Sequence, residues 1–502
     1  MGRWCFRGDE CAEYLSATLA CLRMSKERVQ IIEAEIAACE LQMRTILQCV
    51  PRSNKTLIIT TGDISDVDGF FALAQYAKTG ADVMFVMNYP AYLRITVDEC
   101  ILRQNGLGYL YSTKAMLRET NKKRSEHENF TRYKEALSAY GITDDVINDE
   151  SILTTSRINA AMYKLLTDMA FQMATNVWRE FKTESSQLYF CIGGINDINP
   201  FHATSIKSEA LVYAKEFDYT MKPIKDATQK SVYTPDPNPV ELFNTLESYD
   251  SVFLDMNGSA AFYEEEWERS LRNIGHKLHG VVVMGGVYSY KKSATMPAIA
   301  NNLNRLSCST MNQLYAPAKT NNFFGTLNKM HIPVYIVANN AVTEMNTVDA
   351  VTGKKLDAWE EFLKQNSLNK TNLFAYSNAY YKISPYNPPR KPFDYFTAKI
   401  IQHLIDGNIP AHRTEYLIYD KKFGIVLIGT STDWRNVRNT YIDQCDTKPA
   451  ADDSDFIQKK KESFAAEQIV LRQEVDSTDH LSVFVVEPVM NPDTFEVTVP
   501  LY

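Results

Sequence analysis

From residue 55 onward, the chain alternates short apolar runs with stretches of helical pattern, and this alternation narrows the folds open to it. The runs are KTLIITTG (55–62), DVMFVMN (82–88), QLYFCIGG (187–194), GVVVMGG (280–286) and IPVYIVANN (332–340). Runs that are continuously apolar are typical of parallel strands covered on both faces. EYLIYDKKFGIVLIG (415–429) reads as a hairpin. We therefore predict an α/β fold with a doubly wound, mostly parallel sheet.

Residues 1–50 precede this pattern and are predicted to form an N-terminal helical extension. Within it, apolar side chains recur at alternating spacings of three and four, which makes a heptad seam over about three heptads. The seam can join copies of the chain into a homo-oligomer or larger assembly, or it can pack on its own chain. The rest, 55–502, is expected to carry insertions near 112–150, 203–275 and 446–468, where the sequence turns polar and charged.

The composition excludes several classes of protein. The formal net charge of −8 gives no sign of the basic surface that nucleic-acid binding favours. The sequence contains no run of eighteen apolar residues, so we expect no membrane span. Nine cysteines without zinc-type spacing favour reduced thiols, and the N-terminus lacks the apolar stretch of a secretory signal. We therefore expect an intracellular, cytoplasmic protein with a sizeable core.

Three aspartates follow the first apolar run within six residues: Asp63, Asp66 and Asp68. In an open α/β sheet, ligands bind outside the carboxyl ends of the strands, where these residues fall. Carboxylates so close repel one another unless water, a cation or a ligand compensates them. Oxygen ligands of this kind suit calcium or magnesium. Helix capping explains one such aspartate, and a phosphotransferase D-x-D motif is a further alternative.

Taken in order, these segments resemble the nucleoside hydrolase family, the inosine-uridine-type N-ribohydrolases. Asp63 and Asp68 have the spacing of its D-x-x-x-D-D calcium motif, and FCIGGINDINP (190–200) resembles its G-P-L-T-N turn. VVVMGGVY (281–288) is similar to its M-G-G strand, and ANNLNRLSCSTMNQLYA (300–316) is a loose version of its E-F-N segment. PFDYFTAKI (392–400) resembles its H-D-P-L-A-V-A segment. The likeness spans about 55–495.

The resemblance implies a calcium-dependent enzyme that cleaves the N-glycosidic bond of a ribonucleoside or related riboside. The implied residues are the metal ligands Asp63, Asp68, Asn196 (through its carbonyl) and Asp394, the catalytic carboxylates Asp63 and Asp66, and the sugar-binding residues Asn88, Asn302 and Asn304. Calcium would lower the pKa of a bound water, and the resulting hydroxide would attack C1′ through an oxocarbenium-like transition state.

Several positions depart from the family pattern. The first of its two adjacent aspartates falls on Val67, and the histidine before its last calcium ligand falls on Phe393. A shift of one residue would make Asp68 the first aspartate, but it places Gly69 at the calcium ligand and loses the Asp63 match. Loss of a general base typically costs about 10²–10⁴ in rate. We therefore expect a degraded active site that serves binding or assembly, with an active calcium-dependent N-ribohydrolase as the alternative.

Overall fold

The computed structural model describes residues 55–63, 67–89, 155–183, 186–196, 239–288, 311–338, 341–342, 358–383, 391–419, 426–429, 479–491 and 493–502. The predicted extension 1–50 and the predicted insertions 112–150 and 446–468 lie outside these residues. So do three of the predicted site residues, Asp66, Asn302 and Asn304.

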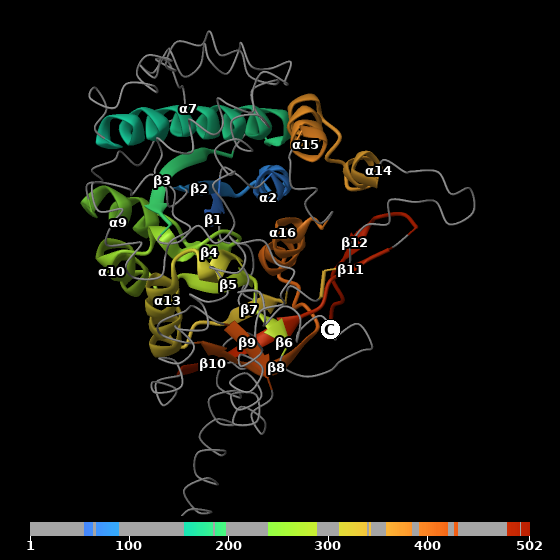
Figure 1. Ribbon diagram of the computed structural model, residues 1–502. Coiled ribbons are helices and arrows are strands. Elements are labelled where there is room, and N and C mark those ends of the chain that lie inside the picture. The colour runs from blue at the N-terminus through green and yellow to red at the C-terminus, as the bar shows by residue number, and fades with distance from the viewer. Residues whose placement is uncertain are drawn as a thin grey trace, which may run out of the picture. The chain divides into compact units, whose positions relative to one another are not determined.

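A ten-stranded sheet runs through the described part of the chain in the order β3-β2-β1-β4-β5-β7-β10-β8-β9-β6 (Figure 1). The strands are β1 (Thr56–Asp63), β2 (Asp82–Tyr89), β3 (Leu188–Ile195), β4 (Ser251–Met256), β5 (Leu278–Met284), β6 (Val287–Tyr288), β7 (Val334–Val337), β8 (His412–Tyr419), β9 (Val426–Gly429) and β10 (Asp479–Val486). From β3 to β10 all neighbours are parallel. β8 is antiparallel to β10 and β9, so the predicted hairpin is confirmed. The predicted α/β fold with a mostly parallel sheet is also confirmed.

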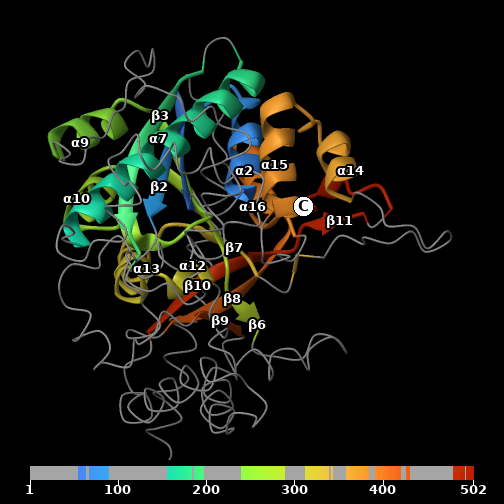
Figure 2. The same cartoon turned by 45° about the horizontal axis from the view of Figure 1, so that its top comes forward.

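Helices cover both faces of this sheet (Figures 1 and 2). One group packs together on one face: α2 (Asp68–Ala77), α7 (Thr155–Phe181), α15 (Thr371–Ile383) and α16 (Phe393–Ile405). The other group contains α9 (Pro239–Glu247), α10 (Glu265–Asn273) and α13 (Pro317–Met330). The strand order reverses between β1 and β4, which makes the carboxyl ends of these two strands a topological switch point.

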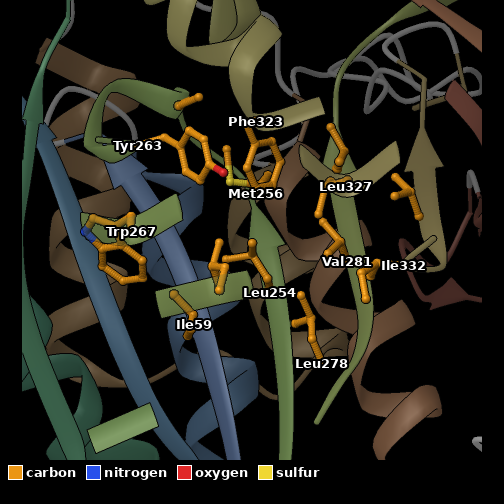
Figure 3. Close-up of a cluster of buried hydrophobic side chains, with 14 of the residues drawn as sticks. Ile59, Leu254, Met256, Tyr263, Trp267, Leu278, Val281, Phe323, Leu327 and Ile332 are labelled. Atoms are coloured by element: carbon orange, nitrogen blue, oxygen red, sulfur yellow. The ribbon is translucent and has the colours of Figure 1, made fainter. Parts of the chain in front are cut away.

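The main apolar cluster shows why the strands read as continuous apolar runs. Ile59, Leu254 and Val281 come from three adjacent strands, and they meet Trp267 of α10 and Phe323 of α13 (Figure 3). The residues between them in each strand face the opposite helices and are buried as well. Burying one large apolar side chain contributes roughly 1.5–3 kcal/mol, so both layers stabilise the sheet.

The prediction of one insertion over 203–275 is wrong for its described part, 239–275. β4 lies in the middle of the sheet, paired with β1 and β5. α10 belongs to the covering layer, because Trp267 and Leu271 are buried while Glu265 and Glu268 form ion pairs with arginines on its outer face. In sequence this region looks polar, because β4 contains an aspartate and the helix after it is rich in glutamate. One face of that helix nevertheless packs in the core.

Candidate active site

The candidate site lies where β1 ends and α2 begins. Asp63 is the last residue of β1 and pairs in register with Asn88 of β2. Val67 stands immediately before α2, and its side chain is fully buried. The structure does not describe the side chain of Asp63, so its predicted roles in metal binding and catalysis stay predictions.

The structure brings Asp68 and Asp394 together at the first turns of α2 and α16. The side-chain Oδ2 of Asp68 accepts a hydrogen bond from the main-chain N–H of Asp394 at 3.3 Å. Both side chains are buried, with 3% and 4% exposure. A Cβ added at Gly69 would lie 3.4 Å from Oδ2 of Asp394, so that carboxylate faces the main chain of α2. Two of the predicted calcium ligands therefore meet, although 326 positions separate them.

The side-chain chemistry of this pair is compatible with a bound cation. Each carboxylate sits at a helix N-terminus, where the helix dipole stabilises negative charge, but two adjacent buried carboxylates still repel each other. Carboxylate oxygens suit calcium, so the donor type fits the predicted ion. Among the side chains that the structure describes, no group of three or more His, Cys, Asp or Glu is arranged to hold a metal. A calcium ion at this pair would therefore need further oxygen ligands, such as Asp63 or main-chain carbonyls.

Asn196, the predicted carbonyl ligand, follows β3, and β2 lies between β3 and β1. Its main-chain N–H donates to the Tyr89 carbonyl at 2.8 Å, and its Oδ1 accepts from Ser259 Oγ at 2.5 Å. The loop after β4 passes over the end of β1. There the N–H of Gly258 donates to Thr61 Oγ1 at 2.8 Å, and a Cβ on Gly258 would lie 3.3 Å from the Gly62 main chain.

Asn88, the predicted sugar ligand, uses its side chain to join main-chain segments. Its Nδ2 donates to the Ser259 carbonyl at 2.8 Å, and its Oδ1 accepts from the Gly194 N–H at 3.2 Å. The side chain is fully buried. Gly194 is needed for a related reason, because a Cβ there would lie 1.8 Å from the carbonyl oxygen of Ala261. This glycine therefore makes room for main chain of the same protein.

Replacing Asn88 with alanine should lower the free energy of unfolding by about 2–4 kcal/mol, because the buried Ser259 carbonyl and the half-buried Gly194 N–H lose their partner. Denaturant unfolding measures this loss. Asn408→Ala, at an exposed asparagine, is the matched control and should change stability by less than about 0.5 kcal/mol. A stable Asn88→Ala variant that has lost riboside binding would instead assign Asn88 to the ligand.

Two side chains that sequence reasoning missed lie at the carboxyl ends of β4 and β5. The Nδ2 of Asn312 donates to the carbonyls of Asn257 and Met284, the latter at 3.3 Å. Gln313 donates to the same Met284 carbonyl at 3.2 Å. The sequence feature that could have pointed to them is TMNQL (310–314), near the end of the predicted sugar-binding segment 300–316. Asn312 lies eight positions after the predicted Asn304.

A buried acid, Asp255, was also missed. It lies in β4, and its Oδ2 accepts a hydrogen bond from the Tyr76 hydroxyl and lies 3.2 Å from Thr397 Oγ1. Its Oδ1 has no hydrogen-bond partner among the described residues. Burial raises the pKa of Asp255 to about 7, although the hydrogen bonds from Tyr76, Thr397 and Asn257 act in the opposite direction. Burial and the nearby Asp255 charge raise the pKa of Tyr76 well above its ordinary value.

Comparison with known proteins adds a structural likeness. No protein-family model and no curated protein sequence matches the chain. Among solved structures, the chain is similar to the type III effector protein XopQ, which was crystallised with adenosine diphosphate ribose. The two share 7% sequence identity with a TM-score of 0.35, over 86% of this chain and 98% of XopQ. Within the described residues, no helix is long and apolar enough to cross a membrane. The fold class thus rests on the strand order, and the candidate site rests on its own residues.

Proposed function

We propose that this chain is a nucleoside hydrolase-like protein that binds a ribonucleoside or related riboside, together with calcium, at the carboxyl edge of its sheet. We further propose that its hydrolytic step is impaired, so that it serves as a binding component. The observation that carries the proposal is the meeting of Asp68 and Asp394 at the starts of two helices beside the switch point.

The Asp68–Asp394 pair supplies negative charge in a region where water is largely excluded. A calcium ion bound there would offer positive charge to the ribose hydroxyls and lower the pKa of a bound water. Negative charge beneath a sugar also stabilises an oxocarbenium-like centre. These features support the binding of a riboside in either the impaired or the active form of the protein.

Two apolar residues flank this charged pair and favour impaired hydrolysis. Val67 stands next to Asp68 and is fully buried, so no carboxylate occupies the place of the first of the two adjacent aspartates. Phe393 stands before Asp394, where the family resemblance would put an ionisable histidine. The retained Asp68–Asp394 pair is the observation that favours the alternative, an active calcium-dependent N-ribohydrolase.

The proposal predicts saturable binding of at least one of inosine, uridine and guanosine by the calcium-loaded protein, with little release of free base. Calorimetry measures the binding, and chromatography measures the base. Val67→Asp should raise base release by about 10²–10⁴-fold over wild type, because it restores a carboxylate that can accept a proton from water. Val67→Asn is the matched control, because it offers the same helix-capping oxygen without a base.

The outcomes separate the two forms of the proposal. Fast base release by the wild-type protein would replace the impaired form with the active enzyme. No binding of any of the three ribosides, with or without calcium, would contradict both for these substrates. The assembly role of residues 9–50 is a separate proposal, tested by the solution mass of a chain that lacks residues 1–50.

A further inference from the structure

A single oxygen atom connects the two helices that carry the aspartate pair. Oδ2 of Asp255, in β4, accepts from the Tyr76 hydroxyl of α2 and lies 3.2 Å from Thr397 Oγ1 of α16. All three residues are fully buried. Tyr76 follows Asp68 by about two helical turns, and Thr397 follows Asp394 by about one. One carboxyl group thus contacts α16 just behind its first turn and α2 in its last turn.

The start of α16 is held most tightly in this network. Thr397 Oγ1 lies 2.5 Å from Asn257 Oδ1 and 2.9 Å from the carbonyl oxygen of Asp394. Asn257 is anchored in turn, because its Nδ2 donates to Thr60 Oγ1 of β1 at 3.3 Å. Hydrogen bonds in a buried network are strong and directional. The one hydroxyl proton of Thr397 is shared between Asn257 Oδ1 and the Asp394 carbonyl, so this hydroxyl lies between the carboxyl end of β4 and the main chain of Asp394.

The contact between α2 and α16 is polar farther along as well. Gln75 donates to Gln402 Oε1 at 2.6 Å, and the Tyr395 hydroxyl lies 3.4 Å from Gln75 Oε1. Apolar side chains would fill this space without the cost of burying polar groups, but they would leave the helices freer to slide. A buried acid that bonds both helices sets their register, which is an established use of buried polar groups.

We propose that Asp255 is a positioning residue, which acts through Tyr76 and Thr397 to hold α2 and α16 so that Asp68 and Asp394 meet. The proposal deepens the proposed function, since it concerns the same aspartate pair. The placement itself is independent of calcium and riboside, so it is tested on the full-length protein without either.

Amide hydrogen exchange measured by mass spectrometry reports this placement. The reporters are the first turn of α16, where the Asp394 N–H donates to Asp68, and the first turn of α2. Asp255→Leu should speed exchange in both first turns by about five- to tenfold, the effect of losing one or two buried hydrogen bonds. Peptides from α9 and α13, which lie in the other helix layer, are internal references and should not change. Asp255→Asn keeps an acceptor oxygen and should restore most of the protection.

Two milder variants keep the test decisive if Asp255→Leu does not fold. Thr397→Val should speed exchange at the start of α16. Tyr76→Phe should speed exchange in α2, from the last turn, which carries Tyr76, to the first turn, which carries Asp68. Thr326→Val, at a buried threonine of α13, is the matched control and should leave both first turns unchanged. Unchanged exchange in Thr397→Val and Tyr76→Phe, or equal loosening of the reference peptides, would overturn the proposal. Failed calcium or riboside binding with selective loosening intact would overturn only the proposed function.

Discussion

The stability of the wild-type protein relative to its Asp255→Asn variant should fall as the pH rises from about 4 to about 8. The pKa of Asp255 is about 7 in the folded protein, against an ordinary value of 3.8. Between these values the folded state keeps a proton that the unfolded state has lost, so each rise in pH favours unfolding. The contribution of Asp255 is therefore fully present below about pH 4 and is lost as the pH passes about 7.

The expected change is large because Asp255 is fully buried. The gap between the two pKa values corresponds to about 4 kcal/mol at most. Of the groups that face Asp255, Tyr76 is the titratable one, and Thr397 and Asn257 are neutral. The charge of Asp394 acts on Tyr76 in the same direction as that of Asp255. Asparagine has the same shape but carries no charge, so Asp255→Asn should remove the part of the pH dependence of unfolding free energy that comes from Asp255.

Denaturant unfolding of wild type and Asp255→Asn at several pH values measures this effect, since their difference cancels the other titrating groups. Asp493→Asn, at an exposed aspartate, controls for the loss of one negative charge. A wild-type-minus-variant difference that stays constant across this range, or that rises with pH, would contradict the assignment.

The sheet could be predicted from the sequence because buried parallel strands have a local signature. β1, β2, β3, β5 and β7 are continuously apolar where both faces are covered, and each prediction needed only the residues of that strand. β4 was not predicted because it contains Asp255 and is followed by an acidic helix. β4 is buried because β1 and β5 lie on either side of it, and a local sequence pattern does not show which strands are neighbours.

The sequence predicted those site residues whose role follows from the type of side chain. It did not predict roles that depend on which distant groups a side chain contacts in the fold. Asp68 and Asp394 were proposed as partners only through a family resemblance, and the structure does bring them together. Asn88 was placed correctly at the end of β2, but its partners are main-chain groups 106 and 171 positions away. The pairing of a side chain with distant main chain leaves no trace in sequence spacing.

Replacing either Asp68 or Asp394 with asparagine should weaken calcium binding by about 100-fold or more, because affinity at oxygen-ligand sites depends strongly on the number of charged ligands. Each asparagine keeps the shape of the side chain and one oxygen, so the fold should persist. Asp493→Asn again serves as the exposed control and should bind calcium as the wild type does.

Calcium titration into chelator-treated protein, followed by calorimetry, is the most direct measurement of the central claim that the Asp68–Asp394 pair is a cation site. The account predicts saturable binding by wild type and Asp493→Asn, and binding weakened by about 100-fold or more in both site variants. No binding by the wild type, or equal binding by Asp68→Asn, Asp394→Asn and wild type, would contradict it.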